Sequence, residues 1–266
     1  MARALITGCS TGIGRATAVE LTKRGHDVVA TARRAETLDD LDVAQRLSLD
    51  VTSDESVAAA VAAAGEIDVL VNNAGIDVRG PVEKVPLDAA KRMFDTNFWG
   101  AARMVQAVAP GMRARSRGTI VNVTSLAGRA VGPLGGYYSA SKWALEGLSE
   151  AMDAELRHWG IRTVVIEPGF FDTPILTKVD DDHGLDEPPY DELHRIWQEA
   201  SAILQGPDGP PGPEVVAGAI ADALESDEVR LRYPVGADAE MVVAARESLG
   251  YDQFIATMRE MLKLDW

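Results

Sequence analysis

Short apolar runs alternate with helical patterns through the first half of the chain, and this alternation constrains the fold more than any other feature. Strands that alternate with helices predict βαβ units, which join into a parallel sheet with helices on both faces. Residues 67–71 form a nearly unbroken apolar run, as expected for a strand covered on both sides. We therefore expect a single α/β domain over residues 1–266, with a doubly wound parallel sheet flanked by helices. The expected strands are 3–7, 28–32, 46–49, 67–71, 119–123, 161–166 and 229–233, and the expected helices are 12–24, 54–64, 86–109, 137–159, 213–224, 238–249 and 254–262.

Residues 170–213 interrupt this pattern, because they have little periodicity, many prolines and an acidic run at 180–182. A long irregular insertion in a compact domain is usually a functional loop. We expect a substrate loop or lid here that closes an apolar pocket. Its apolar side chains are Phe170, Phe171, Ile175, Leu176, Tyr190, Ile196 and Trp197. His183 beside the acidic run raises the question of a metal, but no second ligand cluster accompanies it, so we expect a solvated loop and no metal.

A glycine-rich turn, residues 7–14, lies between the first expected strand and the first expected helix. Glycine permits tight turns and close backbone approach, and a helix N-terminus attracts a pyrophosphate. The spacing Gly-x-x-x-Gly-x-Gly departs from the commoner dinucleotide fingerprint, and the alternative is a purely structural turn. In a βαβ context we favour dinucleotide binding. The residues expected to contribute are Gly8, Ser10, Thr11, Gly12, Ile13 and Gly14.

The end of the second expected strand indicates which dinucleotide binds. An acidic residue there would bind the ribose hydroxyl of NAD, whereas an arginine accommodates the additional phosphate of NADP. Here the acidic residue is missing and Arg33 and Arg34 follow the strand. The alternative is ordinary surface charge. We expect NADP(H), with NAD(H) as the second choice, and Arg33 as the better candidate because it comes first.

Tyr138 and Lys142 stand four residues apart within an expected helix, with Ser125 thirteen residues upstream of Tyr138. Positions i and i+4 share a helix face. A free tyrosine has a pKa of about 10, and a nearby ammonium favours the phenolate and so lowers that pKa toward the range useful for proton transfer. The alternative is that the pair are only surface neighbours and Ser125 a strand-end serine. Beside a dinucleotide site, we favour acid/base chemistry.

These residues resemble the motifs of the short-chain dehydrogenase/reductase family, and the resemblance spans nearly the whole chain. The glycine turn is similar to the family's cofactor motif, and Ser125, Tyr138 and Lys142 match its catalytic residues in order and spacing. Further matches are Asn73, Ala74 and Gly75 after the fourth strand, Asn97 in a helix, Asp50 and Val51 beside the adenine, and Pro168, Gly169 and Thr173 near the nicotinamide. Residues 232–236 also resemble the hydroxysteroid-dehydrogenase-like and retinol-dehydrogenase-like branch.

The resemblance implies a Rossmann-type fold and a role for each catalytic residue. Tyr138 would give its proton to a carbonyl oxygen or take one from an alcohol. Ser125 would hydrogen-bond that oxygen, and Lys142 would lower the pKa of Tyr138 and hold the nicotinamide ribose. Asn97 would hold a water that relays protons. The family also implies a homodimer or homotetramer, formed through the helix before Ser125 and the helix that carries Tyr138.

Composition narrows the partners and the location. The net charge of −15 and the pI of about 4.7 disfavour nucleic acid and anionic membrane surfaces. Cys9 is the one cysteine, so no intrachain disulfide forms. No run of 18 apolar residues and no signal-peptide pattern occurs, and we expect a cytoplasmic protein without membrane insertion.

The expected function is NADP(H)-dependent hydride transfer to or from a small lipophilic ketone, aldehyde or secondary alcohol. A second interpretation is an enzyme similar to a 3-oxoacyl-carrier-protein reductase, but the net charge counts against docking of an acidic carrier. A third is a non-catalytic, cofactor-sensing regulatory protein on the same fold. The intact set of Ser125, Tyr138 and Lys142 speaks against that interpretation.

Overall fold

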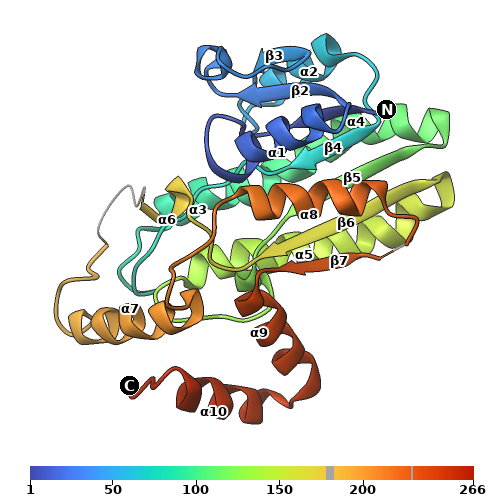
Figure 1. Ribbon diagram of the computed structural model, residues 1–266. Coiled ribbons are helices and arrows are strands. Elements are labelled where there is room, and N and C mark those ends of the chain that lie inside the picture. Colours follow the sequence, from blue (N-terminus) through green and yellow to red (C-terminus); the bar gives the residue numbers. More distant parts are fainter. Residues whose placement is uncertain (178–182, 229) are drawn as a thin grey trace.

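A seven-stranded parallel sheet runs through the computed structural model, which describes residues 1–177, 183–228 and 230–266 (Figure 1). The strand order is β3-β2-β1-β4-β5-β6-β7, so the chain adds strands outward from β1 in one direction and then, from β4, in the other. Every neighbouring pair is parallel. Its strands are β1 (Arg3–Ile6), β2 (Asp27–Ala32), β3 (Gln45–Ser48), β4 (Val69–Asn72), β5 (Gly118–Val123), β6 (Ile161–Pro168) and β7 (Arg232–Val235). The expected doubly wound parallel sheet is confirmed.

Helices cover both faces of this sheet, because alternate strand residues point to opposite sides. Ala4 and Ile6 of β1 pack with α1 and α8, whereas Leu5 packs with α2 and α4 on the other face. Figure 1 shows α7, α9 and α10 gathered at one end of the molecule, away from β3 and α2. The helices are α1 (Gly12–Lys23), α2 (Asp54–Ala64), α3 (Leu87–Phe94), α4 (Gly100–Arg115), α5 (Gly136–Leu156), α6 (Pro174–Thr177), α7 (Asp191–Gln205), α8 (Glu214–Glu225), α9 (Ala237–Ser248) and α10 (Tyr251–Met261).

The helix expected over residues 86–109 is interrupted and longer than predicted. A π turn at Asp95–Trp99 separates α3 from α4, and α4 continues through Pro110 to Arg115. Such π turns often occur at functional sites, because the extra residue changes the direction of the side chains. Here the turn contains Asn97, whose side chain is buried. The hydrophobic pattern alone contains no signal for this extra residue.

Residues 170–213 contain more regular structure than we expected. Leu193, Trp197, Ala200 and Leu204 recur at helical spacing, and they belong to the amphipathic helix α7. The acidic run at 180–182 lies outside the described residues. The last strand spans Arg232–Val235 rather than 229–233, because its pairing with β6 begins at Arg232, and residue 229 also lies outside the described part. None of the helices described is long and apolar enough to cross a membrane.

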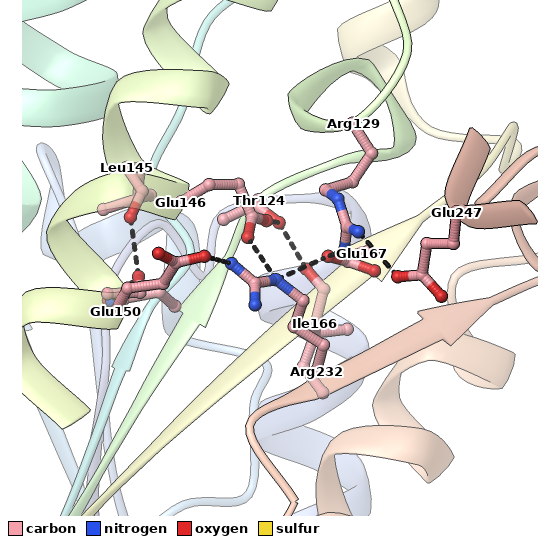
Figure 2. A network of polar contacts seen from close by, with 11 residues as sticks. Thr124, Arg129, Leu145, Glu146, Glu150, Ile166, Glu167, Arg232 and Glu247 are labelled. Carbon is pink, nitrogen blue, oxygen red and sulfur yellow. Dashed lines mark hydrogen bonds and ion pairs between the residues drawn. The ribbon is translucent and has the colours of Figure 1, made fainter. Parts of the chain in front are cut away.

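A buried network of charges fixes the ends of β5, β6 and β7 to helix α5 (Figure 2). The side chain of Glu167 on β6 is fully buried, and it pairs with Arg129 at 2.8 Å and with Arg232 of β7 at 3.3 Å. Arg232 also pairs at 3.0 Å with Glu146 of α5, which accepts a 2.6 Å hydrogen bond from the hydroxyl of Thr124. Burial raises the pKa of Glu167, and its contact with Arg129 offsets this in part.

Replacement of Arg232 tests how strongly the fold depends on this network. Arg232→Met leaves two buried carboxylates with less compensating charge, and losing one partner of a buried ion pair typically costs about 3 kcal/mol or more. We expect a loss of that size in the free energy of unfolding, measured with urea near neutral pH. Arg195→Met, which removes an exposed pair with Glu199, should change it by less than about 0.5 kcal/mol.

The pH dependence of this loss is a further check. Because the pKa of Glu167 is raised in the folded protein, protonation of Glu167 stabilises the fold at low pH, and this contribution is lost as the pH rises through the folded-state value. The Arg232→Met loss should therefore be smaller at mildly acidic pH than above neutrality. Equal losses for the two variants, or a loss that grows on acidification, would contradict a dependence of the fold on this network.

Candidate active site

A cavity of about 1280 Å³ lies at the carboxyl ends of the parallel strands, where α/β sheets usually bind ligands. It extends from the glycine turn to the C-terminal helices. The predicted site residues that line it are Gly8, Ser10, Thr11, Gly12, Ile13, Arg33, Asp50, Val51, Asn73, Ala74, Gly75, Ser125, Tyr138, Lys142, Pro168, Gly169 and Thr173. Gly14 and Asn97, the other two predicted residues, do not line the cavity.

The glycine turn brings backbone against backbone at the start of the cavity. Gly8 and Gly12 have φ of 74° and 58°, which residues with a Cβ rarely adopt. A Cβ on Gly14 would lie 2.5 Å from the carbonyl oxygen of Gly8, so Gly14 serves packing behind the turn. Thr11 precedes α1 without a side-chain cap, and the first turn of α1 has no acidic residue. This combination fits a pyrophosphate, which the helix N-terminus would attract.

Asn73 and Thr7 hold the glycine turn against the end of β4. The amide nitrogen of Asn73 donates to the backbone oxygens of Thr7 and Gly8, at 2.9 and 3.3 Å. In return, the hydroxyl oxygen of Thr7 accepts from the backbone N–H groups of Asn73 and Ala74, at 2.9 and 3.0 Å. The glycine turn and the segment after β4 are therefore linked by hydrogen bonds in which each segment contributes a side chain that bonds to the backbone of the other.

Arg33 and Asp50 lie on the same stretch of the cavity wall, after β2 and β3. The Arg33 guanidinium is exposed and makes no hydrogen bond or ion pair within the part of the chain that the structure describes. Arg34 does not line the cavity. The Asp50 carboxylate accepts from the N–H and hydroxyl of Thr52 at 2.9 and 2.7 Å, and these bonds lower its pKa. Arg33 is thus a cation available to a ligand at this end of the cavity.

Ser125, Tyr138 and Lys142 come together on the cavity wall. Ser125 follows β5, and its hydroxyl oxygen accepts from the N–H of Ala127 at 3.1 Å. The Lys142 ammonium donates to the carbonyl oxygen of Val123 at 3.0 Å and lies 5.7 Å from the centre of the Tyr138 ring. Burial lowers the pKa of Lys142 to about 8. The ammonium is therefore held by the end of the strand that precedes Ser125.

The pKa of Tyr138 is shifted in the direction opposite to our expectation. Burial raises it, and the negative charge of Asp77 adds to the rise, while a hydrogen bond with Ser125 acts against it. Tyr138 is partly exposed when the whole residue is considered, so the part that is buried is the hydroxyl end of its side chain. We expected Lys142 to lower the pKa, but burial of the hydroxyl and the charge of Asp77 decide its direction in this structure. The geometry thus keeps Tyr138 as a neutral phenol, which is a proton donor.

Asn97 acts behind the cavity. Its side-chain oxygen accepts from the N–H of Ile76 at 2.9 Å, and its amide nitrogen donates to the Ile76 carbonyl at 2.9 Å and to the Ser141 hydroxyl at 3.1 Å. Asn97 therefore joins the loop after β4 to helix α5, which carries Tyr138 and Lys142. The water that the resemblance implies at Asn97 remains a prediction.

Several residues on the cavity wall were not anticipated from the sequence. Phe170, Phe171, Ile175 and Trp197 line the cavity as expected of the 170–213 segment, whereas Tyr190 and Ile196 do not. The side chain of Leu176 is not among those that the structure describes. Phe254, Ile255, Met258 and Leu262, in or just after α10, add an apolar wall from the C-terminus. Among the polar residues that we missed are Asp77 and Arg79, which closely follow the Asn73-Ala74-Gly75 motif.

Comparison with known proteins assigns the chain to a family. The model of the family described as short chain dehydrogenase matches residues 2–184. Retinol dehydrogenase 8 of Homo sapiens is 44% identical over 190 residues, which cover 65% of this chain and 59% of that protein. The chain therefore spans about three fifths of the length of this curated relative. The similarity supports the predicted retinol-dehydrogenase-like branch.

Two solved structures of similar length share the fold over nearly the whole chain. A short-chain dehydrogenase from Streptomyces avermitilis is 34% identical, with a TM-score of 0.82 and coverage of 99% of this chain and 96% of that one. A short chain dehydrogenase from Burkholderia cenocepacia J2315 in complex with NADP is 27% identical, with a TM-score of 0.78 and 97% of each chain covered. The chain belongs to the short-chain dehydrogenase/reductase family, whose members are NAD(P)-dependent oxidoreductases of CH–OH and C=O groups.

Proposed function

We propose that this protein is an NADP(H)-dependent oxidoreductase that interconverts a lipophilic ketone or aldehyde and the corresponding alcohol. The observation that carries the proposal is that one cavity brings together the residues that such a reaction would use. The glycine turn and Arg33 lie along it, Ser125, Tyr138 and Lys142 meet on its wall, and apolar side chains from α7 and α10 line it as well. Residues 1–266 would act as one domain, with 170–213 as the lid.

The cofactor would be held by residues along the cavity. The turn around Gly12 would receive the pyrophosphate, Asp50 and Val51 would lie by the adenine, and Arg33 would bind the additional phosphate of NADP. Pro168, Gly169 and Thr173 would meet the nicotinamide, and Lys142 its ribose. When bound, the nicotinamide supplies or accepts the hydride.

The protein residues would handle the proton. Tyr138 would donate its phenolic proton to the oxygen of the substrate carbonyl, and the neutral state that burial favours is the state this donation requires. Ser125, which already acts to lower the pKa of Tyr138, would donate to the same oxygen and orient it. Lys142, whose pKa is about 8, would be mostly protonated at neutral pH and would stabilise the phenolate left behind.

Substitution of Tyr138 tests the acid/base assignment. Tyr138→Phe keeps the ring and removes the exchangeable proton, and loss of a general acid typically costs about a hundredfold or more in rate. We expect a loss of that size in kcat on a panel of lipophilic carbonyls, with retinol tested for oxidation, and nearly unchanged NADPH affinity. Tyr137→Phe is the matched control, because Tyr137 does not line the cavity. Near-normal turnover by Tyr138→Phe would disprove the assignment.

Substitution of Arg33 tests the cofactor preference. A charge-assisted hydrogen bond contributes about 1.5–3 kcal/mol, so Arg33→Ala should weaken NADPH binding by roughly tenfold or more. NADH binding should barely change, since NADH lacks the additional phosphate. Arg34→Ala, outside the cavity, should leave both affinities close to wild type in the same fluorescence titration. If Arg33→Ala weakened both cofactors equally, Arg33 would not read the phosphate.

We also propose that the chain forms a homodimer or homotetramer. Trp99 before α4 and Trp143 on α5 are 54% and 44% exposed, although large apolar side chains favour burial. A second copy would cover them, since twofold pairing is the commonest soluble assembly. Light scattering should give a mass of at least twice 28.5 kDa at micromolar concentration. The mass of a single chain together with full activity would rule this out.

A further inference from the structure

An ion pair that the reaction described above does not use lies on the cavity wall. Asp77 and Arg79 follow β4 and the Asn73-Ala74-Gly75 motif, and the Arg79 Nε donates to Asp77 Oδ2 at 2.7 Å. Asp77 is only 7% exposed, yet both residues border the cavity. Burying a carboxylate is costly unless it is paired, and Arg79 supplies the pairing. The pair is therefore a partly buried ion pair that forms part of the cavity wall.

The pair has hydrogen-bonding capacity left over. The second carboxylate oxygen, Asp77 Oδ1, is buried without a hydrogen-bond partner. The Arg79 Nη1 and Nη2 groups make no hydrogen bond within the described residues, and the side chain is one third exposed. Buried polar groups normally find partners, so an acceptor and a set of donors side by side indicate a missing group that both donates and accepts.

The position of the pair places that missing group near the reacting centre. Asp77 interacts electrostatically with Tyr138 and with Lys142, and Arg79 also interacts with Tyr138. The Cα of Gly75, two residues before Asp77, is close enough to Lys142 that a Cβ there would lie 3.7 Å from the ammonium. A substrate whose carbonyl oxygen met Tyr138 would lie in the cavity that Asp77 and Arg79 also line.

We propose that Asp77 and Arg79 bind a hydroxyl group that the substrate carries close to its reacting carbonyl, so that the preferred substrate is a lipophilic hydroxy ketone or hydroxy aldehyde. The hydroxyl would donate to Asp77 Oδ1 and accept from an Arg79 N–H. This inference rests on the proposed function and narrows its substrate class.

The charges favour a hydroxyl over the charged alternatives. A substrate carboxylate would be attracted by Arg79 but repelled by Asp77. Asp77 also already neutralises part of the positive charge of Arg79. A substrate ammonium would pair with Asp77 but face both Arg79 and Lys142. A neutral hydroxyl satisfies the donor and the acceptor without adding charge to a partly buried site.

The test compares ketones that differ at a single group. The probes are a long-chain methyl ketone, the hydroxymethyl ketone with the same tail, the corresponding α-keto acid and the aminomethyl ketone, each reduced with NADPH. We expect wild type to prefer the hydroxymethyl ketone over the methyl ketone by about tenfold or more in kcat/KM, as for a hydrogen bond to a charged group. Asp77→Asn and Arg79→Met should each reduce this ratio at least severalfold.

The controls separate this inference from folding and from the proposed function. Asp153→Asn, which breaks an ion pair with Arg157 outside the cavity, should keep the wild-type ratio. NADPH titration and thermal unfolding identify a variant that does not fold. If Asp77→Asn does not fold, the ratio measured for Arg79→Met decides the test, because Arg79 is the more exposed partner and its replacement disturbs the fold less. An unchanged ratio in the folded variants, or a wild-type preference for the keto acid or the amine, would overturn the hydroxyl site. Absence of any carbonyl reduction by wild type would instead overturn the proposed function.

Discussion

The placement of the candidate active site depends on the buried carboxylate of Glu167 and its two arginines. Arg129 and Arg232 approach this carboxylate from different segments, and through Arg232 it is joined to Glu146, one turn after Lys142 on α5 (Figure 2). Glu146 in turn holds Thr124, the residue before Ser125. The network therefore sets the end of β5 relative to the face of α5 that carries Tyr138 and Lys142. Because a buried carboxylate must stay paired, this arrangement resists local change.

The sheet and most of the site could be predicted from the sequence because both depend on local signals. Apolar runs of strand length mark β1, β2 and β5, and the glycine turn lies between a strand and a helix as expected. Since the carboxyl ends of parallel strands meet at one edge, residues that follow different strands, such as Gly8, Asn73 and Ser125, line the same cavity.

The rest could not be predicted because it depends on contacts between distant segments. The two partners of Glu167, Arg129 and Arg232, come from parts of the chain that are distant in sequence. Nothing local in residues 251–262 indicates that α10 forms a cavity wall. The direction of the Tyr138 pKa shift likewise depends on burial and on Asp77, and the spacing to Lys142 alone suggested the opposite. Gly14 and Asn97 match their motifs but lie behind the cavity.

The most direct test of this account is to follow the hydride itself. NADPH that carries deuterium at its transferable position would be incubated with the wild-type protein and a lipophilic hydroxy ketone, and the product alcohol analysed by mass spectrometry and NMR. The account predicts that deuterium appears on the carbon that was the carbonyl carbon, in step with NADPH consumption. An alcohol without the label, or no alcohol from any carbonyl tested, would contradict it.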